Sequence, residues 1–133
     1  MIARRLTNLV VALCLLLAAC DTPMEPDGSA VFRVEVVEET FRILLRDPNR
    51  IAEAEQHLLS GRVGVLSGTL RAGDGSFNSS YSWHLDPATV HFPDAAIELC
   101  SGLPSFVEAD LDYWLNTVRT YCPWGAKIVR RER

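Results

Sequence analysis

Hydrophobic and polar positions alternate along the chain after residue 30. Residues 31–37 place apolar side chains at every second position, and residues 41–46 repeat this period after a short acidic turn. A period of two is typical of a strand with one buried face. We therefore predict a β-hairpin, and its buried residues are expected to be Phe32, Val34, Val36, Phe41, Ile43 and Leu45.

The hydrophobic period changes after Asp47, which predicts a helix near residues 48–60. Asp47 is a suitable N-cap, and Pro48 fits the first helical position, where no backbone N–H is needed. Gly61 supplies a C-terminal stop. The buried stripe of this helix is expected to contain Ile51, Ala54, Leu58 and Leu59.

Further strands are predicted on both sides of a turn at residues 72–76. Residues 63–70 alternate and contain two glycines, and residues 81–86 alternate until Pro87 ends the strand. Another strand is expected from Val90 to Cys100 with an interruption at Pro93, and a last short strand at 127–129.

A second helix is predicted at residues 106–119. Ser105 and Glu108 have the spacing of a capping box at its start. Its apolar face is expected to contain Val107, Leu111, Trp114, Leu115 and Val118. Because hairpin patterns dominate, the fold class is predicted to be α+β, with a mostly antiparallel sheet, two helices and one disulfide.

The N-terminus has the composition of an export signal. Arg4 and Arg5 precede an uncharged run over residues 6–19, which as a helix would cover only about 21 Å of a bilayer core of roughly 30 Å. The run ends in Leu17-Ala18-Ala19-Cys20, which resembles the lipobox of bacterial lipoproteins. An ordinary secretory signal with a chance cysteine is the alternative.

The lipobox resemblance implies cleavage before Cys20 and attachment of palmitate-type acyl chains to this residue. We expect a signal peptide at 1–19, a flexible tether at 20–30 and a single domain at 31–133. The mature protein would then be anchored to the cell membrane, facing the periplasm or exterior. Asp21 resembles the inner-membrane retention signal of proteobacterial lipoproteins.

Composition and charge exclude some partners. The 133 residues are 48% hydrophobic, which suits one globular domain, and the formal net charge is −4. Cleavage after residue 19 removes Arg4 and Arg5 and no acid, so 11 basic residues face 17 acidic ones, a net charge of −6. Nucleic acid is therefore not expected as a partner, and the acyl chains would have to supply the membrane attachment.

Two cysteines remain in the predicted domain. Cys100 and Cys122 are expected to form a disulfide in an oxidising compartment, closing a loop that contributes about 3 kcal/mol. A zinc pair or a redox dithiol is the alternative, but no second cysteine pair or Cys-x-x-Cys spacing favours either.

The strongest pattern for chemistry is a polar strand face. His84 and Asp86 lie two residues apart beside Ser82, and His91 follows after the Pro87 turn. Imidazole and carboxylate groups are able to hold a divalent metal, or to act as a base and its orienting group. The alternative is local structure, with His84 hydrogen-bonded nearby and Asp86 capping the turn.

An ordered set of short motifs points to a family. These are Gly73-Asp74-Gly75, Phe77-Asn78, Ser82-Trp83-His84-Leu85-Asp86-Pro87, Glu98-Leu99-Cys100-Ser101-Gly102-Leu103-Pro104, Val107-Glu108 and Tyr121-Cys122-Pro123-Trp124. Over residues 31–129 the chain resembles a family of small exported domains that occur singly in bacteria and as an N-terminal module in slime-mould proteins. The family often has an acid after the first cysteine, where this chain has Ser101. The resemblance implies a shared fold and export, and no catalytic residue.

Three functions are compatible with these observations. No nucleophile elbow or phosphate loop is present, which favours a non-enzymatic, lipid-anchored binding module without a cofactor, whose partner is an envelope protein or a small ligand. Trp124, beside the expected disulfide, is its candidate binding residue. The alternatives are a metal-dependent enzyme or metal-binding domain using His84, Asp86 and His91, and an extracytoplasmic enzyme inhibitor.

Overall fold

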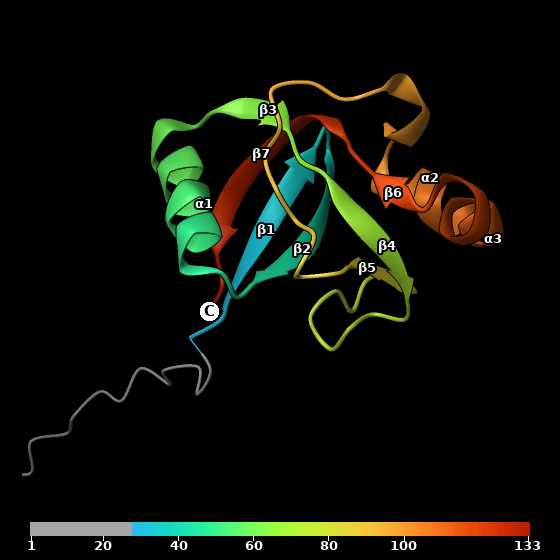
Figure 1. Cartoon of the computed structure of the whole chain (residues 1–133), viewed down its shortest axis with the longest axis horizontal. Coiled ribbons are helices and arrows are strands. Elements are labelled where there is room, and N and C mark those ends of the chain that lie inside the picture. Colours follow the sequence, from blue (N-terminus) through green and yellow to red (C-terminus); the bar gives the residue numbers. More distant parts are fainter. Residues whose placement is uncertain (1–27) are drawn as a thin grey trace, which may run out of the picture.

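The computed structural model of the chain describes residues 28–133. The predicted signal peptide, Cys20, Asp21 and the tether up to residue 27 lie outside the described residues. Two antiparallel sheets and several helices make the fold α+β, as the sequence predicts. Figure 1 shows helix α1 (Pro48–Ser60) against the larger sheet, with α2 (Pro104–Ala109) on the opposite side of the molecule.

The larger sheet has the strand order β2-β1-β7-β3. Its strands are β1 (Ala30–Val36), β2 (Glu39–Leu45), β7 (Trp124–Arg131) and β3 (Val63–Val65). The alternation predicted for the hairpin is confirmed, because the six expected side chains are all buried. The short final strand predicted at 127–129 is instead the eight-residue β7, which pairs with both β1 and β3.

The sheet has two ends that matter for function. At the end where β1 begins, which we call the N-terminal end, Ala30 lies opposite Leu45 and Phe32 lies opposite Arg131. At the other end, which we call the turn end, Val37 links β1 to β2 with a φ of 60°. Six residue steps along β1 separate the two ends by about 20 Å.

Helix α1 has the predicted boundaries and caps. The Asp47 side chain accepts a hydrogen bond from the backbone N–H of Asn49, and Gly61 ends the helix in the left-handed conformation. Ala54 is buried, and Ile51 and Leu58 pack partly buried against the core. The prediction that Leu59 is buried is wrong, because 87% of this side chain is exposed.

The single strand predicted at 63–70 is two strands in different sheets. Residues 63–65 form β3, and β4 (Gly68–Ala72) belongs to the smaller sheet, of order β5-β4-β6, with β5 (Trp83–Leu85) and β6 (Thr120–Tyr121). The chain changes sheet at Leu66 and Ser67, both buried. Gly68 allows β4 to approach β5, because a Cβ atom there would lie 3.1 Å from Leu85 Cδ1.

The strand predicted from Val90 to Cys100 is absent. His91 forms one isolated bridge with Ser67, and the only regular structure in the segment is the 3-10 turn η1 (Glu98–Cys100). The cause is the rest of the sheet: β7 already occupies the interior position between β1 and β3.

The second predicted helix is broken. It consists of α2, α3 (Leu111–Tyr113) and the π-helical turn η2 (Trp114–Val118), with a break at Asp110. The predicted capping box is also wrong. Leu103 occupies the N-cap position, the Ser105 hydroxyl donates to Glu39, and Glu108 bonds to Ser82. Both acids therefore act between elements.

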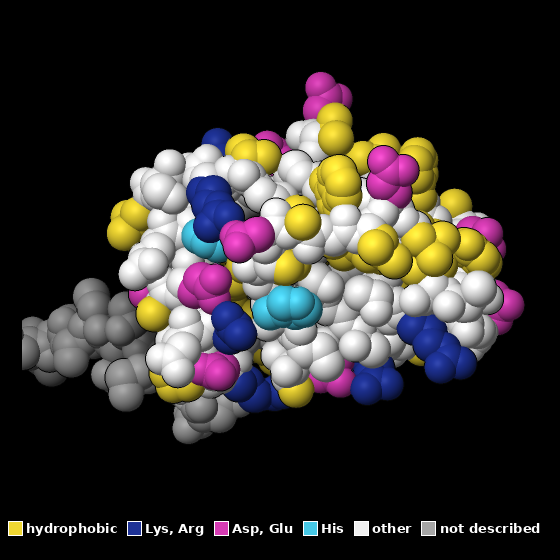
Figure 2. Space-filling view, turned by 45° about the horizontal axis from the view of Figure 1, so that its top comes forward, with side chains coloured by type: hydrophobic (Ala, Val, Ile, Leu, Met, Phe, Trp, Pro, Cys, Tyr) yellow, Lys and Arg dark blue, Asp and Glu magenta, His cyan; other side chains and the backbone are white. Residues whose placement is uncertain are grey.

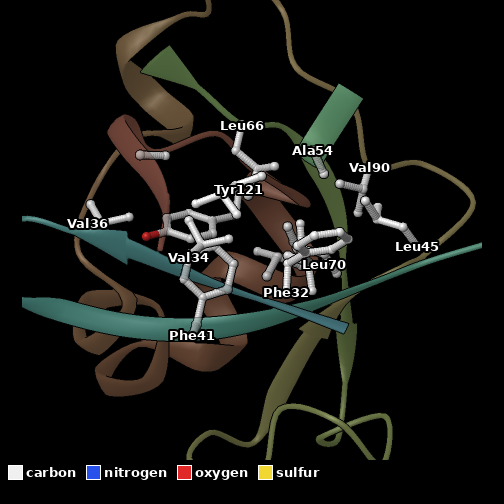
Figure 3. Close-up of a cluster of buried hydrophobic side chains, with 14 of the residues drawn as sticks. Phe32, Val34, Val36, Phe41, Leu45, Ala54, Leu66, Leu70, Val90 and Tyr121 are labelled. Atoms are coloured by element: carbon white, nitrogen blue, oxygen red, sulfur yellow. The ribbon is translucent and has the colours of Figure 1, made fainter. Parts of the chain in front are cut away.

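The core is closed by the described residues themselves. Figure 3 shows side chains from both sheets meeting, among them Phe41, Leu70 and Tyr121. The buried ring of Trp83 lies 5.5 Å from Phe41 and 5.4 Å from Tyr121, measured between centroids. Within residues 28–133, no helix combines the length and apolar character needed to cross a bilayer.

Candidate functional site

His84 is engaged by the loop beside its own strand. Its Nδ1 atom lies 2.7 Å from the carbonyl oxygen of Gly73, and its ring packs edge-on against Phe77 at 5.4 Å. Because a carbonyl only accepts hydrogen bonds, Nδ1 is the donor. The side chain thus has the local role that the sequence left open as an alternative to chemistry.

Asp86 and His91 have separate partners. One Asp86 carboxylate oxygen accepts from the Arg71 guanidinium at 3.0 Å, and the other accepts from the backbone N–H of Ala88. The hydrogen bond from Arg71 is the main reason why the pKa of Asp86 is lowered. His91 Nδ1 lies 2.9 Å from the carbonyl oxygen of Thr89.

The predicted metal ligands do not form one cluster. Across residues 28–133, no group of three or more histidine, cysteine or acidic side chains is placed to hold a metal ion. Ser82, on the same predicted face, donates its hydroxyl to Glu108 and so joins the loop before β5 to α2. The geometry gives His84, Asp86 and His91 structural partners, and it assembles no base, nucleophile and ligand site from them.

The Cys100–Cys122 disulfide is present, as predicted, with the two Cα atoms 5.0 Å apart. The backbone N–H of Cys122 also donates to the carbonyl oxygen of Cys100 at 2.7 Å. This bond and the disulfide hold η1 beside the start of β7. Trp124 comes two residues after Cys122, donates its backbone N–H to the Ser101 hydroxyl, and is 46% exposed.

Apolar side chains are exposed around this disulfide. We call them the disulfide-end surface, which consists of Val37, Ile97, Leu99, Phe106 and Trp124, each between 46% and 72% exposed. Figure 2 shows hydrophobic side chains gathered on this side of the molecule, with acidic side chains among them. Contiguous exposed apolar surface is uncommon on a monomer and marks sites of interaction.

Several contacts bring these residues together from distant parts of the sequence. Val36, beside Val37, pairs with Ala126 on β7, two residues from Trp124. Glu39 binds Ser105, the neighbour of Phe106, and the disulfide fixes η1, which carries Leu99. The disulfide-end surface is therefore held at the turn end by the sheet register, by an ion-dipole cap and by a covalent bond.

Acidic side chains flank the disulfide-end surface. They come from the β1–β2 turn, from η1 and from the α2–α3 segment, and they are Glu38, Glu98, Asp110 and Asp112, all exposed. An apolar centre with a charged rim is the usual anatomy of a protein–protein interface. The signs of the charges favour a partner surface that carries lysine or arginine.

Sequence reasoning found only Trp124 of this surface. It assigned Ile97 and Leu99 to a strand and so expected alternate positions there to be buried. The available signal was the combination of apolar residues, proline and a disulfide cysteine over residues 93–100, which is poorly suited to a central strand.

The structure defines the class of the protein as a small α+β domain with two antiparallel sheets closed by one disulfide. A family model described as the BP-74 N-terminal domain matches residues 28–133, so the chain belongs to the BP-74 N-terminal domain family. The match covers all the described residues and supports the small-domain family that the motifs indicate. No curated protein and no solved structure matches the chain.

Proposed function

We propose that this protein is a lipid-anchored, non-enzymatic protein-interaction module of the bacterial cell envelope. Its anchor is the acylated Cys20, and its binding face is the disulfide-end surface. The observation that carries the proposal is the exposure of five large apolar side chains around one disulfide. The lipobox-like leader supports the anchor.

A folded protein is the partner that this surface suits best. Trp124 and Phe106 supply aromatic groups of the kind that dominate binding energy, and η1 is already rigid through its disulfide, so little ordering entropy is lost on binding. The acidic flank favours a partner with a basic rim. A partner that is itself an enzyme would make the chain an extracytoplasmic inhibitor, which is the second form of the same proposal.

The arrangement of the two ends supports a role away from the bilayer. Cys20 is separated from Ser29 by eight residues, which reach at most about 30 Å, and β1 then begins at the N-terminal end of the sheet. The disulfide-end surface lies at the turn end, about 20 Å along β1. An anchored molecule would thus hold this surface toward the periplasm.

The anchor is tested by the intact mass of the mature protein from its native host. We expect a chain that begins at Cys20 and carries acyl chains, and a Cys20→Ser variant that is released from the membrane. A mature chain that starts at another residue, or an unmodified thiol at Cys20, would contradict the anchor.

The binding face is tested by photo-crosslinking in the native envelope. A photoreactive residue at position 99 or 124 is expected to capture one specific protein, whereas the same residue at position 59 is not. Leu59 is the matched control because it is an exposed apolar side chain on α1, away from the disulfide. Capture of the same proteins from all three positions would show non-specific contact.

The captured partner then gives a quantitative test. We expect Trp124→Ala to weaken its binding by at least ~10-fold and Leu59→Ala to leave it unchanged. Higher salt should weaken binding further because of the acidic flank. Equal affinities for the wild type and Trp124→Ala would exclude this face as the binding site.

A further inference from the structure

A second polar feature lies at the opposite end of the molecule from the disulfide-end surface. It is an open hollow of about 370 Å³ between the β2–α1 junction and the segment after β5. We call it the arginine hollow. Its lining residues are Arg46, Asp47, Arg50, Pro87, Ala88, Thr89, Val90 and His91.

The charge of the lining favours an anion. Arg46 and Arg50 contribute two permanent positive charges, and His91 adds an imidazole whose Nδ1 is bound to Thr89, so that Nε2 remains for a ligand. One carboxylate, Asp47, also lines the hollow, and it accepts the N-cap hydrogen bond from Asn49. Arg50 binds Glu53 through Nη1 alone, and a guanidinium has five N–H donors. Two guanidinium groups together suit a phosphate.

The position of the hollow indicates where this phosphate comes from. Arg46 directly follows Leu45, which lies opposite Ala30 in the sheet register. The hollow is therefore beside the place where the folded chain begins, and Cys20 is ten residues before Ala30. If Cys20 is acylated, this end of the molecule faces the lipid headgroups.

The distribution of charge agrees with this orientation, although the net charge does not. Five of the eleven basic residues in 28–133 lie at the N-terminal end, namely Arg46, Arg50, Arg130, Arg131 and Arg133. The acidic flank described above lies at the turn end. A net charge of −6 for the mature chain predicts no attraction to anionic lipid, but local potential near the bilayer depends on the nearest charges, within about one Debye length.

We infer that the arginine hollow binds the phosphate of an anionic phospholipid headgroup and so orients the anchored domain on its membrane. This inference rests on the lipid anchor of the proposed function. The apolar wall of Pro87, Ala88 and Val90 suits the glycerol and carbon atoms next to the phosphate.

The test uses the mature chain, residues 20–133, with Cys20→Ser, so that the acyl chains do not contribute to binding. Its partition is measured onto vesicles of phosphatidylcholine alone and of equal parts phosphatidylcholine and phosphatidylglycerol. We expect partition onto the anionic vesicles only. Arg46→Gln with Arg50→Gln should weaken it roughly 30-fold, because each basic residue near an anionic bilayer contributes about fivefold.

The matched control removes the same charge elsewhere. Arg62 lies beyond the C-terminal end of α1, and Arg119 ends the η2 turn. Arg62→Gln with Arg119→Gln should keep most of the partition. Equal losses in the two double variants would overturn the inference, because binding would then follow net charge alone. If the first double variant fails to fold, Arg50→Gln alone should still cost about fivefold.

The other source of phosphate is distinguished by a soluble probe. Inorganic phosphate is titrated by calorimetry against the same chain. Saturable binding of phosphate without partition onto anionic vesicles would overturn the lipid assignment and leave a site for a free anion. None of these results depends on acylation, so a failure here is separate from a failure of the intact-mass test of Cys20.

Discussion

Asn78 shows how one side chain joins two sheets. It is fully buried, its Oδ1 atom accepts from the backbone N–H of Arg42 on β2, and its Nδ2 atom donates to the carbonyl oxygen of Trp83 on β5. Asn78→Ala leaves both backbone groups without a partner. We expect it to lower the free energy of unfolding by about 2–4 kcal/mol, measured by urea denaturation. The exposed neighbour serves as control, since Ser79→Ala should change stability by less than about 0.5 kcal/mol.

Glu132 gives the fold a dependence on acidic pH. Burial by itself raises its pKa, but hydrogen bonds and charge from Arg42 and Arg33 outweigh burial and hold the pKa of Glu132 below its ordinary value of 4.5. The unfolded chain therefore binds this proton more readily than the folded one. The stabilisation is complete above pH 4.5 and is lost as the pH falls through the lowered pKa.

The corresponding experiment compares Glu132→Gln with the wild type between pH 7 and pH 3. Glu132→Gln should be less stable by about 1–2 kcal/mol at pH 7, and the difference should shrink as the pH falls below 4.5. Glu35→Gln, on the same strand as Arg33, controls for the loss of any surface carboxylate. A constant difference across the whole pH range would contradict the assigned role.

Sequence patterns could not have predicted these residue roles. Asn78 binds Arg42, 36 positions away, and Glu132 binds Arg42, 90 positions away. Periodicity reports which face of a local element is buried, and it contains no information on contacts between elements. For the same reason, His84 and Asp86 were correctly placed on one strand, while their partners Gly73 and Arg71 were not foreseen.

At the scale of elements, Glu39 acts as a cap supplied from another part of the chain. Its two carboxylate oxygens accept from the backbone N–H and the hydroxyl of Ser105, at 2.8 and 2.6 Å, in the first turn of α2. We expect Glu39→Ala to destabilise the protein by about 1–2 kcal/mol in urea denaturation. Glu38→Ala, in the same β1–β2 turn and exposed, is the matched control. Equal effects of the two changes would show that the turn, and not the cap, is responsible.

The success of the element predictions depended on how local the determinants were. Helix α1 has its N-cap, first-turn proline and glycine stop within its own sequence, and its boundaries were predicted correctly. The 106–119 segment has the correct buried face, with Val107 and Trp114 inside, but its backbone breaks at Asp110. Apolar spacing specifies which side chains face the core, and it does not specify continuous helical hydrogen bonds.

At the scale of the whole molecule, the fold separates two surfaces of different chemistry. The sequence supplied the hairpin, the disulfide and Trp124, but the disulfide-end surface arises only when η1, α2 and the β1–β2 turn meet. The arginine hollow likewise combines Arg50 with His91, which are far apart in the sequence. Sites made from loops of different elements depend on topology, which hydrophobic patterning leaves open.

The separation of these surfaces predicts that they work independently. Changes more than about 10 Å apart without shared partners usually have additive free energies, and the two ends of β1 are about 20 Å apart. Trp124→Ala should weaken binding of the crosslinked partner and leave vesicle partition unchanged, whereas Arg46→Gln with Arg50→Gln should do the reverse. The triple variant should show the product of the separate effects, measured on the Cys20→Ser mature chain. If the arginine changes also weakened partner binding, the rigid strands between the two ends would have to couple them, and the membrane would then regulate the interaction.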